Sequence, residues 1–415
     1  MDLLSGPVVL PWWGTLLLAL LLTHITMAAV TIYLHRHMAH AALELHPLPA
    51  HFFRLWLWLT TGMSTKEWVA IHRKHHAKVE TADDPHSPVA QMEKRNIRSR
   101  WARFWFMCLW IPWRGVRSYV AESRINETIN NTNYCRGVPD DWIERNVYGK
   151  HRKLGIGCMM LIDILLFGPV IGIAMWLFQM AWTPVFAAGV INGVGHMFGY
   201  RNFEVADRST NIVPWGIIIA GEELHNNHHA YPTSAKLSVR RGEFDIGWLY
   251  IRMLEMCGLA KVKKKIPVPE FGEERLLDHN LVETMVFHRG ALMREYQRLM
   301  HTEWKSELAR LKKAKHTEAA AFIADLKRAK KLVCSGALQL SPGERSELDA
   351  IYLRHPTLSS LAQMRNDLQV IWTDRAATCD DALARLTLWC KSAEASGSSE
   401  LRKFSRNFVR SLRSS

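Results

Sequence analysis

The sequence predicts an all-α integral membrane protein with about three membrane-spanning helices, shorter interfacial helices, and a histidine-rich cap on their inner side. Three observations predict this class: long runs without charge, lysines and arginines concentrated between and after those runs, and histidines gathered in three short clusters. The 415 residues are 48% hydrophobic, so a sizeable core is possible and disorder throughout is excluded. The seven cysteines form no C-x-x-C pair, which argues against a disulfide framework or a zinc ribbon.

The first span is predicted at residues 7–34, a run without a charged side chain. Its length exceeds the roughly 20 residues that cross a bilayer, so we expect the helix to tilt. A cleaved signal peptide would carry a basic region before the apolar run, whereas Asp2 is the only charge there. We therefore expect the mature protein to retain this span.

Two further spans are predicted at residues 155–178 and 182–200, in which Asp163 is the only charged residue. The uncharged junction QMAWTP between them predicts a tight helical hairpin with its turn at residues 179–184. The stretches 52–63 and 101–113 are shorter and rich in tryptophan, and Arg54 and Arg103 interrupt them. Such stretches are typical of helices that lie in the membrane interface.

The distribution of lysine and arginine predicts the orientation, because these residues favour the inner side of a membrane. They are dense from His35 to Lys153 and again after Tyr200, and they are absent from the extreme N-terminus and the predicted hairpin tip. We expect the N-terminus outside, with the histidine clusters and the C-terminus in the cytoplasm. The formal charge of +14 is explained by basic residues that face anionic lipid, so no nucleic-acid partner is expected.

The chain is expected to divide near residue 260. Residues 1–260 form the predicted membrane domain, and residues 261–415 form a basic, helical C-terminal region with heptad-like apolar positions. Pro342 and Glu344 fit the first turn of one of its helices. The residues of this region leave its role open between docking an electron donor, contacting anionic lipid and covering the inner face.

The twenty histidines matter chiefly through three boxes at the spacing of metal ligands. In H-x-x-H-H, residues at i, i+3 and i+4 project from one side of a helix, so several imidazoles can converge on a metal. The first box spaces its outer histidines by five, which separates them by about 140° on a regular α-helix, so they face different metals or the helix ends there. His37 is its uncertain member. The candidate ligands are His35 and His40 in the first box, His72, His75 and His76 in the second, and His225, His228 and His229 in the third.

A fourth element, Asn192-Gly-Val-Gly-His196, closes the third predicted span. Its i, i+4 spacing points both side chains the same way. A histidine within a span is costly without a partner or function, so His196 is a ninth candidate ligand. Asn192 is a candidate for binding directly or through water.

The acidic residues near the histidine boxes have two possible roles. Glu222 and Glu223 precede the third box and are either carboxylates that orient imidazoles or ordinary acids at a helix start. Asp84 and His86 follow the second box and are expected to shape a turn with Pro85 rather than to bind metal.

The number of imidazoles predicts two metals, because eight or nine ligands are too many for one ion. A nitrogen site without thiolate suits iron, zinc, copper or nickel, and residue type alone does not choose among them. Iron would allow the pair to activate oxygen.

These motifs resemble those of the membrane fatty acid desaturases, most closely the stearoyl-CoA desaturase type and its bacterial members that act at the ninth carbon. The resemblance rests on HRHMAH, HNNHH, WVAIHRKHHAKVETADDPHSP and NGVGHMFGYRNFE, and it covers residues 8–260. It implies a cytoplasmic di-iron centre held by the nine histidines with Asn192 acting through water. It also implies O2 as co-substrate, an acyl-lipid or acyl-CoA substrate in a narrow apolar channel, and a place in a bacterial inner membrane.

The sequence differs from the desaturase family pattern in ways that affect the expected electron donor. The animal enzymes have four spans, whereas this chain starts at their second span. The region after about residue 265 has no counterpart in the family, and no H-P-G-G haem sequence occurs. The resemblance therefore implies that electrons come from a separate ferredoxin, rubredoxin or flavoprotein.

Two other functions compete with desaturation. A membrane di-iron hydroxylase of alkyl chains uses similar ligands, but that type has an H-x-x-x-H first box and an N-Y-x-E-H-Y-G element, which this sequence lacks. A non-enzymatic membrane metal-binding or transport protein would usually have more spans, inverted repeats and ionisable groups at mid-membrane.

Overall fold

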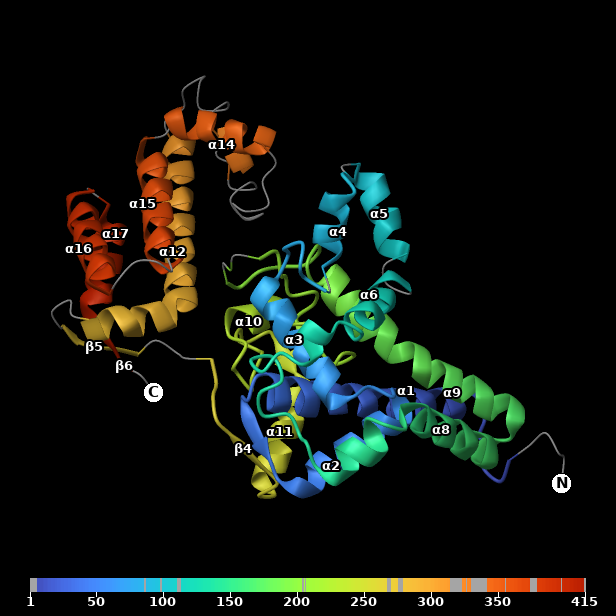
Figure 1. Cartoon of the computed structure of the whole chain (residues 1–415). Coiled ribbons are helices and arrows are strands. Elements are labelled where there is room, and N and C mark those ends of the chain that lie inside the picture. Colours follow the sequence, from blue (N-terminus) through green and yellow to red (C-terminus); the bar gives the residue numbers. More distant parts are fainter. Residues whose placement is uncertain are drawn as a thin grey trace. The chain divides into compact units, whose positions relative to one another are not determined.

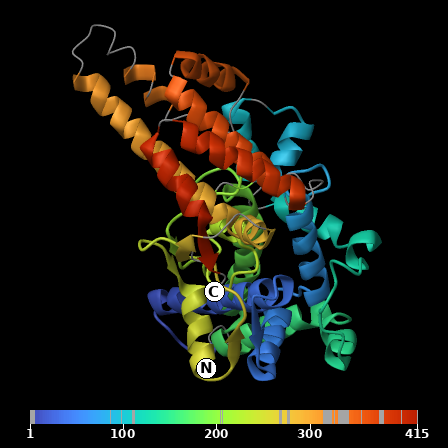
Figure 2. The same cartoon turned by 90° about the vertical axis from the view of Figure 1, so that its left-hand side faces the viewer.

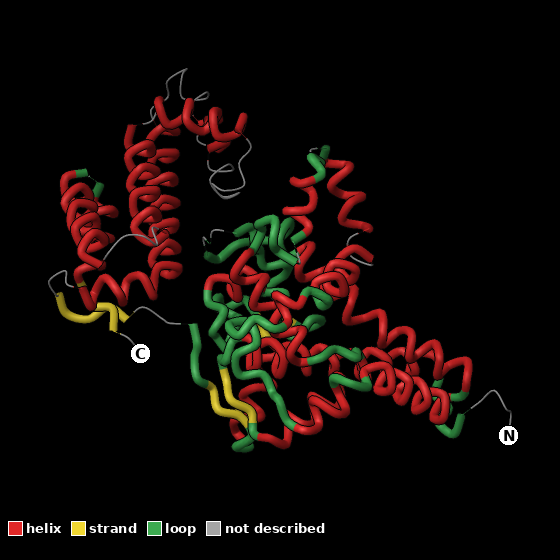
Figure 3. Tube along the Cα trace, in the orientation of Figure 1, coloured by secondary structure: helices red, strands yellow, loops and turns green. Residues whose placement is uncertain are grey.

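The computed structural model confirms a mostly helical protein (Figure 1). It describes residues 6–85, 87–97, 99–109, 113–203, 205, 207–266, 270–274, 279–313, 323–325, 327–329, 342–354, 356–373, 379–396 and 398–413. The described strands form three two-stranded sheets (Figure 3). The chain separates into two compact units, one of residues 1–201 and 207–266 and the other of residues 202–206 and 267–415.

Unit 1 carries a succession of helices with a few short strands. Its elements are α1 (Trp12–Ala29), η1 (Val30–Ala39), β1 (Leu43–Leu45), α2 (Pro47–Thr60), α3 (Thr65–Lys78), α4 (Pro88–Lys94), α5 (Arg100–Leu109), α6 (Gly115–Glu122), α7 (Asn126–Ile129), η3 (Glu144–Tyr148), α8 (Arg152–Phe167), α9 (Pro169–Thr183), η4 (Pro184–Val194), β2 (Trp215–Gly216), α10 (His225–Ala230), β3 (Phe244–Asp245), α11 (Ile246–Met256) and β4 (Ala260–Val262).

Two helical stretches in the described part of the chain are long and apolar enough to cross a membrane. They are α1 with η1, 28 residues from Trp12 to Ala39, and α9 with η4, 26 residues from Pro169 to Val194. Helix α8 has 16 residues, which is shorter than the roughly 20 that a span needs. The structure therefore supports two of the three predicted spans by length.

The predicted hairpin exists, but its turn lies elsewhere. The chain reverses at Gly168, which has a φ of +82°, and Pro169 begins α9. Glycine adopts this left-handed conformation without a Cβ clash, and proline suits the first turn of the next helix. The predicted spans 155–178 and 182–200 are therefore wrong in their boundaries: the first contains the turn, and the helix runs unbroken through residues 179–184. The Val8 amide donates to Leu166 O at 2.9 Å, which places residue 8 beside this turn.

The outer faces of the long helices are apolar. Helix α1 exposes Leu16, Leu17, Leu20 and Leu21, and the α8–α9 hairpin exposes leucine, isoleucine and valine along its length. Helices α2 and α5, which overlap the two predicted interfacial stretches, also expose large apolar side chains on one face. These surfaces fit contact with lipid.

The C-terminal end of the first long helix is embedded in a core that positions the first box. Side chains of η1 pack against Phe53 and Leu57 of α2 and Ile251 of α11. Antiparallel pairing of β1 with β4, in register from Leu43 opposite Val262, joins the segment after the first box to the end of α11. Figure 2 shows α11 and β4 in yellow beside the blue first helix.

Unit 2 has its own core, and a strand near its beginning pairs with a strand near its end. Strand β5 (Glu270–Glu274) pairs antiparallel with β6 (Arg410–Arg413). The buried side chains between its helices form one cluster that includes Tyr296, Leu368 and Trp389. Its described helices are α12 (His279–Lys313), α14 (Pro342–Arg354), α15 (Pro356–Thr373), α16 (Cys379–Ala395) and α17 (Ser399–Val409).

Candidate metal centre

The nine candidate histidines gather into two groups of ring nitrogens. In each group, one ligand atom per residue lies within 4.8 Å of every other ligand atom. Cluster A consists of His35, His40, His72, His76 and His228, and cluster B consists of His75, His196, His225 and His229. Segments separated by more than 150 residues in the sequence thus meet at both clusters.

The first box reaches cluster A through π-helical geometry. The His40 amide donates to His35 O at 3.0 Å, a bond between residues five apart. A π-turn closes over five residues rather than four, so both imidazoles lie on one side, with ring centroids 4.7 Å apart. The 140° separation expected on a regular α-helix does not occur. Both histidines consequently serve the same cluster.

The second and third boxes each divide between the two clusters. Helix α3 sends the i, i+4 pair His72 and His76 to cluster A and His75 to cluster B. Helix α10 does the reverse, with His225 and His229 in cluster B and His228 in cluster A. The second and third boxes therefore each contribute to both clusters, which keeps the clusters adjacent.

The ring nitrogens that face one another are the Nε2 atoms. In cluster A, the Nε2 atom of His228 lies 3.1 Å from that of His35 and 2.9 Å from that of His76, and His40 and His72 approach to 2.9 Å. In cluster B, the Nε2 atoms of His196 and His225 are 3.0 Å apart.

Four carboxylates hold the Nδ1 atoms of four of these histidines. Asp84 lies 2.8 Å from His75, Glu222 2.9 Å from His35, Asp207 3.0 Å from His229 and Glu80 3.2 Å from His196. An Nδ1–H that donates to a carboxylate leaves the Nε2 lone pair directed into the cluster. These acids therefore orient the imidazoles as metal ligands require.

Sequence reasoning identified only part of this carboxylate set. Glu222 orients an imidazole, as one of its two readings proposed, but that imidazole belongs to the first box. Glu223 instead accepts the backbone amides of Ile219 and Gly221. Asp84 accepts the Glu80 amide as a turn would, and it also supports His75, so the turn reading was incomplete.

Glu80 and Asp207 were missed altogether. Glu80 follows the second box by four residues and has a φ of +60°, and Asp207 lies in a loop between the fourth element and the third box. Neither has a spacing that marks it as a partner of a histidine. His86 lies outside the described residues.

Burial disfavours the charged form of several cluster imidazoles. Desolvation, followed by repulsion from neighbouring imidazoles, lowers the pKa of His40, His76, His225 and His228 well below the ordinary value. Burial also opposes the charged form of His75, but Asp84 raises the pKa of His75 above its ordinary value. Neutral imidazole is the form that binds a metal.

The donor set fits a pair of metal ions. The Nε2 atom of His229 is buried and has no hydrogen-bond partner among the described residues, while its Nδ1 atom is held by Asp207. Converging nitrogen lone pairs repel one another unless a proton or cation lies between them. The five and four nitrogen donors of the two clusters match the coordination numbers of first-row metals, and imidazole suits iron among them.

Arg73, which directly follows the first histidine of the second box, connects helix α3 to the first box by hydrogen bonds. Arg73 donates to the carbonyls of Met38 and Ala39 at 2.7 and 2.8 Å, at the end of η1. It also donates to the carbonyls of Tyr134 and Arg136. The second-box helix is thereby tied to the end of the first box, where His40 meets His72.

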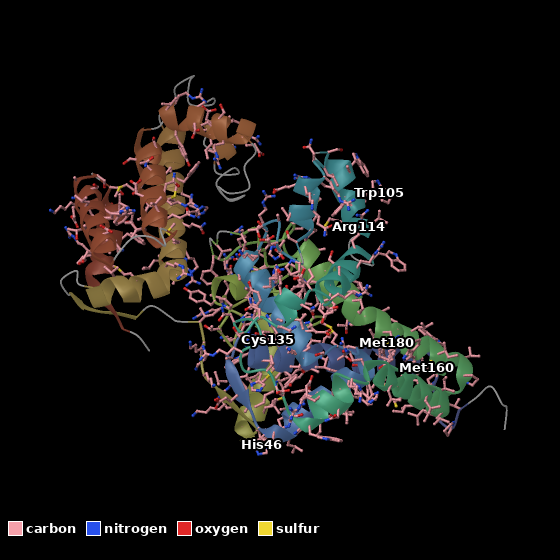
Figure 4. All side chains as sticks on the ribbon, in the orientation of Figure 1. His46, Trp105, Arg114, Cys135, Met160 and Met180 are labelled. Carbon is pink, nitrogen blue, oxygen red and sulfur yellow. The ribbon has the colours of Figure 1, made fainter. Side chains whose placement is uncertain are left out.

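An apolar cavity of about 240 Å³ adjoins both clusters. His35 and His72 of cluster A and His225 of cluster B lie on its wall. Trp68 stacks on the His72 ring at a centroid distance of 4.8 Å and lines the same cavity. Met180, labelled in Figure 4, lines it from α9, and the remaining apolar lining comes from Val30, Met63, Val116, Val120, Pro184, Ala187 and Ile191.

Asn192 and His37 lie outside the two clusters. Asn192 lies on the cavity wall, and its side-chain amide donates to Ala187 O at 3.2 Å. The Nδ1 atom of His37 lies 3.0 Å from Leu43 O, and His37 belongs to neither cluster.

Known proteins resemble the part of the chain that contains the nine cluster histidines. The family model for fatty acid desaturases matches residues 11–239, more than half of the chain. "Delta-9 acyl-lipid desaturase 1" from Arabidopsis thaliana is 27% identical over 252 residues, which cover 60% of this chain and 74% of the relative. "sn-1 stearoyl-lipid 9-desaturase" from Anabaena variabilis is 26% identical over 255 residues, covering 60% and 83%.

One further relative is named for another double-bond position, and one further family model matches another part of the chain. "Icosanoyl-CoA 5-desaturase" from Limnanthes douglasii is 30% identical over 234 residues, covering 56% of this chain and 59% of the relative. Residues 293–414, in unit 2, match a family model described as a transposase. The desaturase match contains the first two boxes, the fourth element and the third box with the helices that carry them. The chain therefore belongs to the fatty acid desaturase family and is an oxidoreductase that acts on fatty acyl chains.

Proposed function

We propose that the protein is an O2-dependent di-iron desaturase that introduces a cis double bond, at the ninth carbon, into a saturated acyl chain carried on a lipid or on CoA. The observation that carries the proposal is the convergence of nine imidazoles beside one apolar cavity. The two relatives named for position 9 support the bond position, and the relative named for position 5 makes that position a separate result to be measured.

The nine histidines would hold two iron ions, with Asn192 contributing through water. Bound iron would supply the activation of molecular oxygen. In the overall reaction, two hydrogens leave adjacent methylenes and combine with O2, two electrons and two protons to give two waters. The chain's own part is to present neutral imidazoles, and the four carboxylates hold Nδ1–H so that Nε2 stays available.

The cavity would select and position the acyl chain. Its wall is mainly apolar, which favours a hydrocarbon and excludes water from the reacting carbons. Because His35, His72 and His225 share that wall, a methylene pair in the cavity would lie beside both clusters. The shape of the cavity would then determine which pair reacts.

We propose that the protein lies in a bacterial inner membrane with its N-terminus outside and the histidine clusters and C-terminus in the cytoplasm. The contact of Val8 with Leu166 supports this topology, because it places two segments without lysine or arginine at the same end. Electrons would come from a separate ferredoxin, rubredoxin or flavoprotein.

Unit 2 would lie outside the catalytic machinery. All nine histidines, the four carboxylates and the cavity residues belong to unit 1. We propose that the partners of the enzyme are an acyl substrate, membrane lipid and an electron donor, without nucleic acid. Because part of unit 2 matches a transposase family model, the absence of a nucleic-acid partner should be tested directly. An electrophoretic mobility shift of duplex DNA by the full chain, with or without sequence preference, would contradict it.

The decisive experiment is lipid analysis of cells that express this chain. Gas chromatography with mass spectrometry should show a new monounsaturated acyl chain with the intact protein and none with His228→Ala. His51→Ala is the matched control, because His51 is an exposed histidine outside both clusters and should leave the product unchanged. Hydroxylated chains would favour a hydroxylase, and no product despite verified iron and a competent donor would refute the acyl substrate.

A further inference from the structure

Helix α11 presents apolar side chains on two opposite sides. Ile251 is fully buried in the core against η1. Leu249, Met253 and Met256 are 45, 56 and 82% exposed, and their i, i+4, i+7 spacing forms one stripe along the helix. An exposed stripe of this kind belongs against a protein or a lipid surface.

The level of α11 along the first long helix is set by a side-chain contact. The Nε2 atom of His24 lies 2.9 Å from the hydroxyl oxygen of Tyr250. Trp56 of α2 donates its Nε1–H to the Thr26 hydroxyl at 3.0 Å, almost level with that contact. Thr26 lies about 21 Å beyond Trp12 at 1.5 Å per residue. Both α2 and α11 therefore flank α1 toward the inner surface of a bilayer whose hydrocarbon layer is about 30 Å thick.

Helix α2, which meets α1 at the Trp56–Thr26 contact, carries a stripe of the same kind. Leu48, Phe52 and Leu55 are 68, 49 and 46% exposed and follow the same i, i+4, i+7 spacing. Two helices that contact the same part of α1 thus expose apolar stripes, which fits a shared lipid interface better than two separate protein contacts.

Four lysines lie in or just after β4, the strand that follows α11. Lys261, Lys263, Lys264 and Lys265 are all exposed. The backbone amides of Lys263 and Lys264 donate to Ala42 O at 2.9 and 3.2 Å, so this segment is held against the start of β1. Among the described residues, Glu44 pairs with Lys263 and lies opposite Lys261 in the β1–β4 register, and Lys264 and Lys265 form no ion pair with a carboxylate. A fixed, largely uncompensated positive segment thus lies next to the apolar stripe.

We propose that α11 and these four lysines form a binding surface for anionic phospholipid headgroups of the inner leaflet. The apolar stripe enters the boundary between headgroups and acyl chains, and the ammonium groups contact the headgroup phosphates. Charge complementarity identifies the occupant, since inner leaflets are negatively charged and each lysine near such a surface strengthens binding about fivefold. This inference rests on the membrane placement proposed above and is independent of the metal clusters.

Cys257 makes the surface measurable. This exposed free cysteine lies between Met256 and the lysines. The full chain, with its other six cysteines replaced by serine, would carry a nitroxide at Cys257 in nanodiscs of phosphatidylcholine alone or mixed with phosphatidylglycerol. We expect the label to collide more often with O2 than with a water-soluble nickel chelate, and phosphatidylglycerol to increase this preference.

Two sets of variants test the role of the lysines. Combined replacement of the four lysines (Lys261→Gln, Lys263→Gln, Lys264→Gln and Lys265→Gln) should abolish the effect of phosphatidylglycerol. Arg240→Gln with Arg241→Gln is the matched control, because both arginines are exposed and lie before α11. Loss of the lipid effect in the control, or its persistence without the lysines, would overturn the proposal.

A second label separates this inference from the membrane placement. Leu17 lies on the exposed face of α1, so a nitroxide on Leu17→Cys reports whether the span is in lipid. The label on Leu17→Cys could lie in lipid while the label on Cys257 lies in water in both lipid mixtures. That result would overturn the proposed headgroup-binding surface but not the membrane span. A Leu17→Cys label in water would overturn the membrane placement itself.

Discussion

Arg36 and Asp245 form a buried ion pair across 209 residues of sequence. The guanidinium Nη1 and Nη2 atoms donate to the two carboxylate oxygens at 3.1 and 3.0 Å, and the side chains are 1 and 0% exposed. The same guanidinium donates to the carbonyls of Ala235 and Ala220. The first box is thereby joined to the segments on both sides of the third box and to the start of α11.

Asp245→Asn should destabilise unit 1 by about 3 kcal/mol, because buried Arg36 loses the carboxylate that accepts two of its hydrogen bonds and keeps only Glu222, at 3.8 Å, as a charge partner. Thermal unfolding of the purified protein in detergent measures the effect. Arg252→Gln is the control: Arg252 pairs with Glu255 on the exposed face of α11, and removing such a surface pair should cost less than about 1 kcal/mol. Equal losses in the two variants would show that the buried pair has no special role.

Asp84→Asn should weaken metal binding about 10- to 100-fold, because the carboxylate that orients His75 is lost. Metal content after dialysis against a graded chelator gives the affinity. Asp83→Asn removes an exposed carboxylate one residue earlier and should leave metal content unchanged. Retention of full metal content in Asp84→Asn would contradict the assignment of Asp84 as the support of His75.

The stability of unit 1 should depend on acid through Asp141. Hydrogen bonding from Arg54 lowers the pKa of Asp141 to about 2, below its ordinary value of 3.8. Because the folded-state pKa is the lower one, the contribution is fully present above pH 3.8 and is lost as the pH falls toward about 2. The stability difference between the protein and Asp141→Asn should therefore shrink over this interval.

Asp140→Asn is the comparison for that measurement. Asp140 is more exposed and lies 3.8 Å from Arg145, so its removal should give a small difference that varies little with pH. Chemical unfolding at a series of pH values would provide both curves. A constant difference for Asp141→Asn from neutral pH to pH 2 would contradict the assigned pKa shift.

Ala187→Trp should block or shorten the acyl site, because Ala187 lines the cavity beside the clusters. We expect turnover of long saturated chains to fall at least tenfold while metal content stays the same. Leu177→Trp places the same side chain on the exposed face of α9 and should preserve turnover. Unchanged products from Ala187→Trp would indicate that the acyl chain binds elsewhere.

Truncation after Lys265 should preserve metal binding and desaturation with a chemical reductant, because unit 1 retains its core and β4. Truncation after Cys257 removes β4 and its pairing with β1, so metal content should fall. Comparing activity driven by the natural donor with activity driven by the reductant tests whether unit 2 docks the donor. Loss of metal in the longer fragment would show that unit 2 supports the fold of unit 1.

Local patterns were sufficient to identify the histidine elements that meet in the two clusters and the helical class. The i, i+3, i+4 spacing of His72, His75 and His76 follows from helix geometry within five residues, so it is readable without any tertiary information. The apolar run of the first helix is equally local. The hairpin turn was readable too, from Gly168 followed by Pro169, but the continuous apolar composition around it concealed the signal.

The sequence by itself determined which histidines are available and that they suit two metals. Only the tertiary structure decided that His35 and His40 share a cluster through a π-turn and that the second and third boxes each divide between clusters. It also decided that Glu222 supports His35 from 187 residues away and that Asp207 supports His229. The physical reason is that spacing along a helix is a property of neighbouring residues, whereas the partner of a ring nitrogen depends on how distant segments pack.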